Sequence, residues 1–139
     1  MISWVPMRFT VAFDEADGEG IVFFGNYFRL AHRALEAYLP TIGISWNEWF
    51  KSPSFGVPLR HVEADYFKPL KPGDVFEAAI RVAEIGESSV SFDYEFKNPE
   101  GQVIARLKTA HVFVNRSTFS KCPVPESLRL KLSGAIPHA

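Results

Sequence analysis

The sequence predicts an α+β protein in which a mostly antiparallel sheet packs against one long helix. Residues 27–38 carry apolar side chains at the spacing of a single helical face. Residues 57–115 contain several strand-like runs separated largely by short turns, and another such run, residues 7–13, precedes the helix. Because a helix with one apolar stripe must bury it, we expect the stripe to lie on one face of the sheet.

Length and charge limit the range of functions. The 139 residues fit a single domain, residues 1–139, and 47% of them are hydrophobic, which is enough for a core. The net charge of −1, with no basic or acidic block, gives no electrostatic support for binding nucleic acid or an anionic membrane. The single cysteine, Cys122, rules out an internal disulfide and cannot form a zinc site alone, so we predict no metal.

The sequence also carries no targeting signal that we can identify. Its N-terminal run lacks the charged segment and long apolar segment of a signal peptide. No run approaches the roughly 18 apolar residues that a membrane helix needs. We therefore expect the protein to reside in the cytoplasm.

The first elements follow from periodicity and turn chemistry. Residues 7–13 alternate as a strand does, and the run DEADGEG after them predicts a turn. Asn26 is the expected N-cap of the long helix, and Pro40 and Gly43 mark its end. The apolar face of this helix is formed by Tyr27, Leu30, Ala31, Ala34, Leu35 and Tyr38.

The later elements are shorter and mostly extended. Ser45 and Glu48 predict a capping box at the start of a second helix over residues 45–50. KNPEGQ predicts a hairpin turn, and Pro125 opens a short C-terminal helix. The predicted strands cover residues 57–70, 75–85, 90–96 and 103–115. One helix leaves sheet edges uncovered, so we expect edges to pair between copies in a homodimer or homotetramer.

The stretch DEADGEGIVFFGNYFRLAHRALEAYL resembles the acyl-CoA thioesterase family typified by 4-hydroxybenzoyl-CoA thioesterase. The family pattern is D-x-D-x-x-G-[IV]-V-[aromatic]-[FY], followed by N-Y at the start of the central helix. Glu15 stands where the family usually has its first Asp. The resemblance, which runs from about residue 8 to about residue 114, implies the hot-dog fold, a five- to six-stranded sheet wrapped around one long central helix. The matching residues are Asp17, Gly20, Ile21, Val22, Phe23, Phe24, Asn26 and Tyr27.

Two stretches, AHRALEAYL and GVPLRHVEADYFKPLKPGD, are similar to 1,4-dihydroxy-2-naphthoyl-CoA thioesterases, and they contain His32 and His61. Members that act on 4-hydroxybenzoyl-CoA carry an acid in place of His32 and a basic cluster in the turn that is IGESSV here. Short-acyl-CoA and acyl-carrier-protein thioesterases usually have Tyr-Glu-Arg where this chain has Ala-His-Arg. The resemblance therefore favours the naphthoyl substrate.

Thioester hydrolysis needs a nucleophile or an activated water and a donor for the oxygen that gains negative charge. The thiol that leaves has a pKa near roughly 8.5, so it departs with little help. By composition alone, Asp17 is a turn former. The resemblance implies instead that Asp17 attacks the thioester carbon or activates a water, and the sequence leaves both routes open.

Phe24 is implied by the resemblance to act through its backbone. The first N–H groups of a helix lack internal partners and lie at the positive end of its dipole, so the Phe24 amide is a candidate oxyanion donor. As an alternative, the Phe24 ring is simply part of the core. Gly20 either lets the backbone approach the substrate or adopts a positive φ, or it is an ordinary turn glycine.

Two histidines have open interpretations. His32 is a surface or packing residue by position, and by resemblance it faces the acyl pocket and hydrogen-bonds an aryl hydroxyl. His61 shares one face of its predicted strand with Leu59 and Glu63. It is either a core or interface residue, or it orients Asp17 or the substrate across a dimer interface.

Glu36 is a competing acid, because another branch of hot-dog thioesterases places its catalytic acid inside the central helix. We interpret Glu36 as a surface charge paired with Arg29 or Arg33. Alternative functions are a thioesterase for 4-hydroxybenzoyl-CoA, short acyl-CoA or acyl carrier protein, and a non-enzymatic acyl-CoA-binding protein, which a retained Asp17 with Gly20 disfavours. The expected partner is a coenzyme A thioester substrate, and we expect no cofactor.

Overall fold

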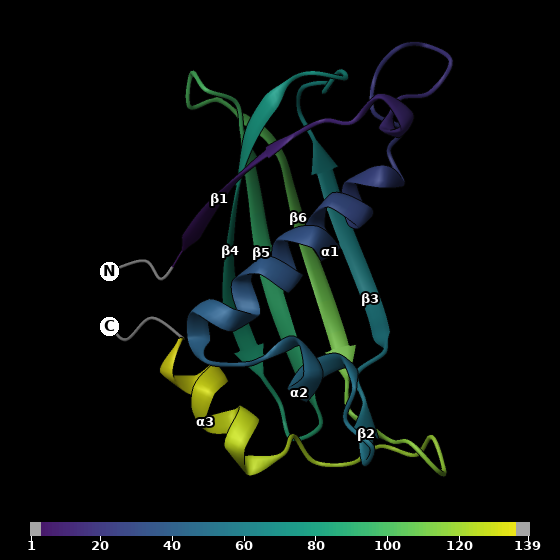
Figure 1. The fold of residues 1–139 in the computed structure, drawn as a ribbon, viewed down its shortest axis with the longest axis vertical. Helices are drawn as coiled ribbons and strands as arrows, with labels where there is room; N and C mark the ends of the chain where they lie inside the picture. The colour runs from purple at the N-terminus through teal and green to yellow at the C-terminus, as the bar shows by residue number, and fades with distance from the viewer. Residues whose placement is uncertain (1–3, 136–139) are drawn as a thin grey trace.

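The computed structural model describes residues 4–135, and its main feature is a five-stranded antiparallel sheet with one long helix across it (Figure 1). The strands are β1 (Val5–Thr10), β2 (Phe55–Gly56), β3 (Leu59–Tyr66), β4 (Val75–Ile85), β5 (Ser89–Lys97), β6 (Val103–Val112) and β7 (Val114–Asn115). The helices are α1 (Asn26–Tyr38), α2 (Trp46–Phe50) and α3 (Glu126–Gly134), with 3₁₀ turns at Phe13–Glu15 and Leu39–Ile42.

The order of strands in the sheet is β1-β4-β5-β6-β3, and every neighbouring pair is antiparallel. Strands β2 and β7 form a separate two-stranded ribbon. The α+β class and the five-stranded sheet predicted from the sequence are therefore confirmed. β3 lies at one edge of the sheet, although it precedes β4 to β6 in the chain, and α1 connects to it through α2 (Figure 1).

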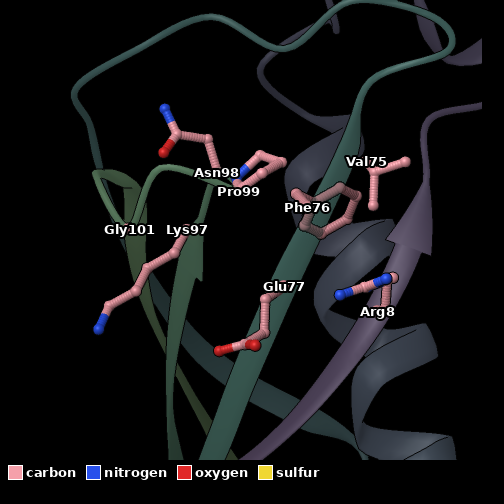
Figure 2. Close-up of a pocket in the computed structure, with 8 residues that line it drawn as sticks. All are labelled: Arg8, Val75, Phe76, Glu77, Lys97, Asn98, Pro99 and Gly101. Atoms are coloured by element: carbon pink, nitrogen blue, oxygen red, sulfur yellow. The ribbon is translucent and has the colours of Figure 1, made fainter.

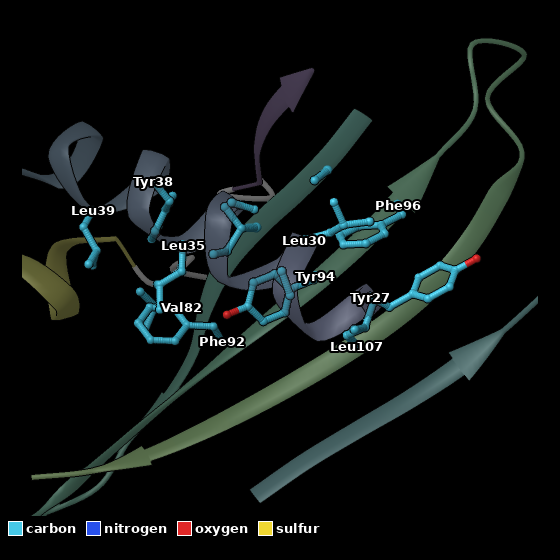
Figure 3. Close-up of a cluster of buried hydrophobic side chains, with 14 of the residues drawn as sticks. Tyr27, Leu30, Leu35, Tyr38, Leu39, Val82, Phe92, Tyr94, Phe96 and Leu107 are labelled. Carbon is cyan, nitrogen blue, oxygen red and sulfur yellow. The ribbon is translucent and has the colours of Figure 1, made fainter. Parts of the chain in front are cut away.

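The predicted apolar face of α1 is the buried face of the helix. The six residues predicted for it are also the six that are buried in the structure. They meet the aromatic side chains of the central strands, among them Phe92, Tyr94 and Phe96, in one continuous core (Figure 3). Burying a side chain such as Leu30 contributes about 1.5–3 kcal/mol relative to leaving it exposed, so this face fixes the position of α1 on the sheet.

The start of α1 differs from the prediction. Its N-cap is Gly25, and Asn26 is the first helical residue, with no capping hydrogen bond from its side chain. The Asn26 amide Nδ2 instead donates to the Glu15 carbonyl oxygen at 2.9 Å, because the preceding loop folds back against the helix. The second predicted cap is half correct: Ser45 Oγ accepts the Glu48 N–H at 3.1 Å, but the Glu48 carboxylate pairs with Lys131.

Two long predicted strands are shorter in the structure. The strand predicted over residues 57–70 is β3 alone, since the N–H groups of Phe67 and Lys68 both turn to the Ile104 carbonyl. The strand predicted over residues 103–115 ends at Val112, where the Phe113 N–H donates to Ser88. The first strand ends at Thr10, three residues earlier than predicted.

A bulge in β3 changes which residues share a face. The register with β6 shifts between Leu59 and His61, so the alternation of side chains is interrupted there. Leu59 lines a cavity on the α1 side of the sheet, not the face of His61 and Glu63 that the uninterrupted pattern predicts. Among residues 4–135, no helix is both long enough and apolar enough to cross a membrane.

Candidate active site

The loop before α1 is a tight hairpin that carries Asp17. Ala16 and Val22 form an antiparallel bridge, the Asp17 N–H donates to the Ile21 carbonyl at 2.8 Å, and the Gly20 N–H donates to the Asp17 carbonyl at 3.0 Å. Gly20 has φ of +80°, which non-glycine residues rarely adopt, and no atom would crowd a Cβ there. The hairpin therefore needs Gly20 for its backbone conformation.

Asp17 lies exposed on this hairpin in the protomer. Its Oδ1 accepts the Glu19 N–H at 2.8 Å, a short local bond that orients the carboxylate. Within residues 4–135, its second oxygen, Oδ2, makes no hydrogen bond. The carboxylate is thus held by its own turn and keeps one oxygen open to a ligand or a water.

Glu15, two residues earlier, is buried and ties the hairpin to the helix. Its Oε1 accepts the Ala12 N–H at 2.7 Å, and its Oε2 lies 3.6 Å from Nη1 of Arg33 on α1. Its carbonyl oxygen accepts the side-chain amide of Asn26. The residue that departs from the family pattern is therefore an anchor for the loop.

The chain enters α1 with two unpaired amides. The N–H groups of Asn26, Tyr27 and Phe28 donate three residues back, and the Phe23 N–H donates to Glu15. Those of Phe24 and the following glycine have no acceptor within residues 4–135. Free amides at the positive end of a 13-residue helix are suited to a developing oxyanion.

The remaining groups of Phe24 are also defined. Its carbonyl oxygen accepts a hydrogen bond from Tyr66 Oη at 3.0 Å, which links the helix entrance to the edge strand β3. Its side chain is 64% exposed and packs on the Phe23 ring, with centroids 4.5 Å apart. The alternative in which Phe24 is simply a core residue is therefore wrong for the protomer.

His32 lies farther along α1, beside a cavity of about 120 Å³. The cavity is bounded by α1, α2 and strands β3, β5 and β6, and its walls include Phe28, Trp49 and Phe50. The His32 ring packs edge-on to Phe50 at 5.5 Å, and its Nε2 lies 3.6 Å from the Glu36 carboxylate. The structure thus brings His32 to an aromatic pocket, although half of its side chain remains exposed.

Three polar side chains form a buried chain at this cavity. Tyr94 Oη and Thr109 Oγ1 are 2.8 Å apart, and His111 Nε2 lies 3.1 Å from the same Thr109 oxygen. Burial lowers the pKa of His111 to about 4, an effect that the Val57 carbonyl opposes and the nearby His32 reinforces. Burial also raises the pKa of Tyr94. Both side chains are therefore neutral at pH 7.

His111, Tyr94 and Thr109 were not among the site residues predicted from the sequence. The alternation of side chains along β6 could have pointed to two of them. Thr109 and His111 alternate with exposed or half-buried residues and share the face of the buried Leu107, so they are a polar pair on an apolar face. Such a pair needs either internal partners or a ligand.

His61 lies apart from these groups within the protomer. It pairs with Ala110 of β6, whereas Val62 pairs with Thr109, so His61 faces the side of the sheet opposite α1. Its Nε2 lies 2.9 Å from Glu63 Oε1. Its proposed role across a dimer interface stays a prediction.

Glu36 does not pair with Arg29 or Arg33 as predicted. Its Oε1 accepts the Trp46 Nε1–H at 2.8 Å, and its Oε2 faces His32, because α2 folds back over this end of α1. Among residues 4–135, no three His, Cys, Asp or Glu side chains lie together in a way that could hold a metal ion.

A larger hollow of about 430 Å³ lies elsewhere, at the hairpin between β5 and β6. Arg8, Glu77 and Lys97 stand side by side across β1, β4 and β5 at its base (Figure 2). None of the predicted site residues lines it. A row of alternating charges does not suit an apolar acyl group, so the cavity beside His32 is the better candidate for that part of a substrate.

Comparison with known proteins identifies a matching family and similar relatives. A family profile described as the Thioesterase-like superfamily matches residues 11–132. The 1,4-dihydroxy-2-naphthoyl-CoA hydrolase of Prochlorococcus marinus (strain NATL1A) is 33% identical over 136 residues, which cover 93% of this chain and 90% of that protein.

Two solved structures share the architecture. A 1,4-dihydroxy-2-naphthoyl-CoA thioesterase from Synechocystis matches with a TM-score of 0.85 and 25% identity, over 94% of this chain and 96% of that one. A gentisyl-coenzyme A thioesterase matches with a TM-score of 0.80 and 26% identity, over 90% of this chain and 99% of that one. The hot-dog fold expected from the resemblance is confirmed.

The matched range contains the Asp17 hairpin, the whole of α1 and strands β3 to β6, which are the parts that form the candidate site. The family profile covers far more than half of the chain, and the fold of its solved neighbours is the fold described above. This chain belongs to the thioesterase-like superfamily.

Proposed function

We propose that this protein hydrolyses an aromatic acyl-CoA thioester to the free acid and coenzyme A, with 1,4-dihydroxy-2-naphthoyl-CoA as the favoured substrate. The observation that carries the proposal is the segment before α1, where the hairpin that bears the Asp17 carboxylate, with one open oxygen, leads directly into two amides that have no acceptor within residues 4–135. Relatives that cover most of this chain are named as hydrolases of that substrate, which supports the choice.

In the proposed reaction, the thioester carbonyl oxygen accepts a hydrogen bond from the Phe24 N–H. Asp17 then acts in one of two ways. It attacks the carbonyl carbon, so that the C–S bond breaks and water later hydrolyses the resulting anhydride, or it takes a proton from a water that attacks. In both routes the sulfur leaves as a thiolate, which needs little help from an acid because the thiol pKa is near roughly 8.5.

An aromatic acyl group fits the surroundings of α1. Phe28 and His32 are spaced at i and i+4 in α1, so they lie on one side of the helix, and both line the aromatic cavity. At 1.5 Å per residue, His32 lies about 6 Å beyond Phe28 along the helix axis, in the direction away from Phe24. A flat ring attached to a carbonyl at Phe24 would therefore extend toward the aromatic cavity, which supports an aryl substrate.

We also infer that the protein assembles through β3, in a homodimer or homotetramer. Within residues 4–135, β3 pairs only with β6, so its other edge is free there, and it exposes the side chains of Leu59, Val62 and Tyr66. The other edge strand, β1, contains Pro6, which lacks an N–H and makes that edge a poorer template for pairing. Because the Tyr66 hydroxyl binds the Phe24 carbonyl, pairing at β3 would place a second copy beside the candidate site.

The decisive experiment is a panel of acyl-CoA thioesters assayed by release of free thiol. We expect wild type to prefer 1,4-dihydroxy-2-naphthoyl-CoA over short acyl-CoAs. Asp17→Asn should lower kcat by at least roughly 100-fold, the usual scale for loss of a general base. The Asn oxygen can still accept the Glu19 N–H, so the hairpin should keep its shape.

Asp14→Asn is the matched control, because Asp14 is an exposed acid of the same loop. It should leave kcat close to wild type. The proposal for Asp17 is wrong if Asp17→Asn remains active while Glu36→Gln is inactive, since that result would assign the acid to α1. Absence of thiol release from every acyl-CoA would instead favour a binding protein.

A further inference from the structure

The buried polar chain of Tyr94, Thr109 and His111 is not used by the reaction proposed above. These residues are 1%, 5% and 6% exposed, and they come from the neighbouring interior strands β5 and β6. All three are among the side chains that line the cavity next to His32. Polar groups are rarely buried at an apolar cavity without a partner that satisfies them.

One atom of this chain lacks such a partner. His111 Nδ1 is buried and makes no hydrogen bond within residues 4–135. The donors and acceptors of the chain can be ordered in either of two directions. Either Tyr94 donates to Thr109 and Thr109 donates to His111, which leaves Nδ1 as an unpaired donor, or the order is reversed and Nδ1 is an unpaired acceptor. The Val57 carbonyl lies near enough to raise the pKa of His111, but it makes no well-formed hydrogen bond with Nδ1, so the chain can still take one partner.

The walls of the cavity suit a flat ring. Phe28, Trp49 and Phe50 contribute aromatic side chains, and the His111 ring is itself edge-on to Phe92 at 5.6 Å. The volume of about 120 Å³ is close to the roughly 150 Å³ of an apolar cavity that accepts benzene. One ring edge fits, and the rest of a bicyclic group would extend along α1 toward Phe24.

We propose that the Tyr94–Thr109–His111 chain is a receptor for a hydroxyl group on the acyl ring and sets the preference of the enzyme for hydroxylated aromatic thioesters. This inference rests on the proposed function and adds the part of the substrate that the cavity selects. A hydroxyl both donates and accepts, so it completes the chain whichever way its protons are ordered. In the favoured substrate, the ring hydroxyl remote from the thioester, at carbon 4, would occupy this place.

The environment favours a neutral hydroxyl over a carboxylate. His111 and Tyr94 are uncharged at pH 7, and among the described residues no Lys or Arg lines the cavity. A buried anion without a cation to pair it would be strongly destabilised. The exposed His32, by contrast, already faces the Glu36 carboxylate, which makes it the weaker candidate for this role.

The test compares 1,4-dihydroxy-2-naphthoyl-CoA with 1-hydroxy-2-naphthoyl-CoA, which lacks only the remote hydroxyl. In wild type, we expect kcat/KM to be at least about tenfold higher for the dihydroxy compound, since a site built to bind a hydroxyl rejects analogues that lack it. In Thr109→Val, which has the same shape but no hydroxyl, this ratio should fall to about 1–3, because the chain is broken at its centre. His111→Leu should lower the ratio in the same way.

Two further variants separate recognition from general damage. Thr109→Ser keeps the hydroxyl and should keep the preference of wild type. Ser91→Ala removes another buried hydroxyl from β5 that does not line the cavity, and the ratio should again be that of wild type. The inference is overturned if Thr109→Val retains the preference, or if only His32→Gln loses it.

Calorimetric binding of the two free acids, 1,4-dihydroxy-2-naphthoic and 1-hydroxy-2-naphthoic acid, separates this inference from the proposed reaction. We expect wild type to bind the dihydroxy acid at least about tenfold more tightly, and Thr109→Val to lose the difference. If both thioesters are hydrolysed at equal kcat/KM, the receptor is wrong and the thioesterase stands. If no thioester is hydrolysed but the acids are still discriminated through Thr109, the reaction is wrong and the receptor stands.

Discussion

Phe24 contributes its backbone amide to the proposed oxyanion site, while its ring lies largely in solvent in the protomer. The Tyr66 hydroxyl holds its carbonyl oxygen, and the Glu15 carbonyl holds the preceding amide of Phe23, so the backbone of residue 24 is fixed on both sides. A fixed amide is suited to transition-state stabilisation because it needs no reorganisation when charge develops.

The backbone amide and the ring of Phe24 should respond differently to mutation. Phe24→Leu should keep kcat within about tenfold of wild type, whereas Phe24→Pro, which has no N–H, should lose roughly 100- to 1,000-fold, as removal of an oxyanion donor does. Thiol release measures activity, and circular dichroism checks folding. If Phe24→Leu abolished turnover in a folded protein, the assignment to the backbone would be wrong.

Glu15 and Asp17 show how neighbouring acids of one loop take different roles. Both occur in the short acidic run before the helix, yet Glu15 is buried and bound on both carboxylate oxygens, while Asp17 is exposed with one oxygen open. The family pattern pointed to Asp17. Glu15 anchors the loop partly through its contact with Arg33, and only the packing of α1 brings Arg33 near.

Strand β3 is the element best placed to contact another copy of the chain. One of its edges has no partner strand in the described part of the protomer, and Leu59, Val62 and Tyr66 are exposed on it. A free edge of this kind is a template for another strand, and although β3 also carries the exposed charges of Arg60, Glu63 and Asp65, it contains no proline. The helix entrance is attached to this strand through Tyr66, so assembly and the candidate site are connected.

A charge on β3 should therefore prevent assembly. We expect Val62→Lys to reduce the mass in solution toward the 15.7 kDa of one chain, as measured by sedimentation, because like charges would meet across the paired edges. Thr10→Lys, on the opposite edge strand β1, should leave the assembly intact. The reverse result would show that β1 carries the interface.

At the scale of the whole molecule, the buried polar chain makes stability depend on pH. His111 has a pKa of about 4 in the folded protein and an ordinary value of 6.5 when unfolded. Between about pH 4 and pH 6.5, the unfolded state binds more protons than the folded state does. The stabilisation is therefore complete above about pH 6.5 and is lost as the pH falls toward 4.

The expected size is about 3 kcal/mol of unfolding free energy lost between pH 7 and pH 4, since each unit of pKa difference corresponds to about 1.4 kcal/mol. Urea titrations at several pH values measure it. His111→Gln should remove this part of the pH dependence, whereas His61→Gln, at an exposed position, should not. Equal slopes for wild type and His111→Gln would contradict the buried, neutral state of the ring.

Much of the fold could be predicted because it follows from patterns among residues that are close together in the sequence. The face of α1 follows from a 3.6-residue period, and β4 was predicted with its observed bounds from its alternation and the flanking turns. The errors occur where distant contacts decide. Asn26 does not cap α1 because its side chain is used by Glu15, and the face of Leu59 changed because a bulge against β6 interrupts the alternation.

The sequence by itself determined the α+β class, the helix and its buried stripe, and the candidates Asp17, Gly20 and Phe24, since these depend on residues close together in the chain. Only the tertiary structure separated His61 from His32, buried Glu15 as an anchor, and joined Tyr94, Thr109 and His111 at one cavity. The physical reason is that hydrogen bonds and burial depend on which strands are neighbours and in which register. A pattern along one strand does not specify what the next strand places beside it.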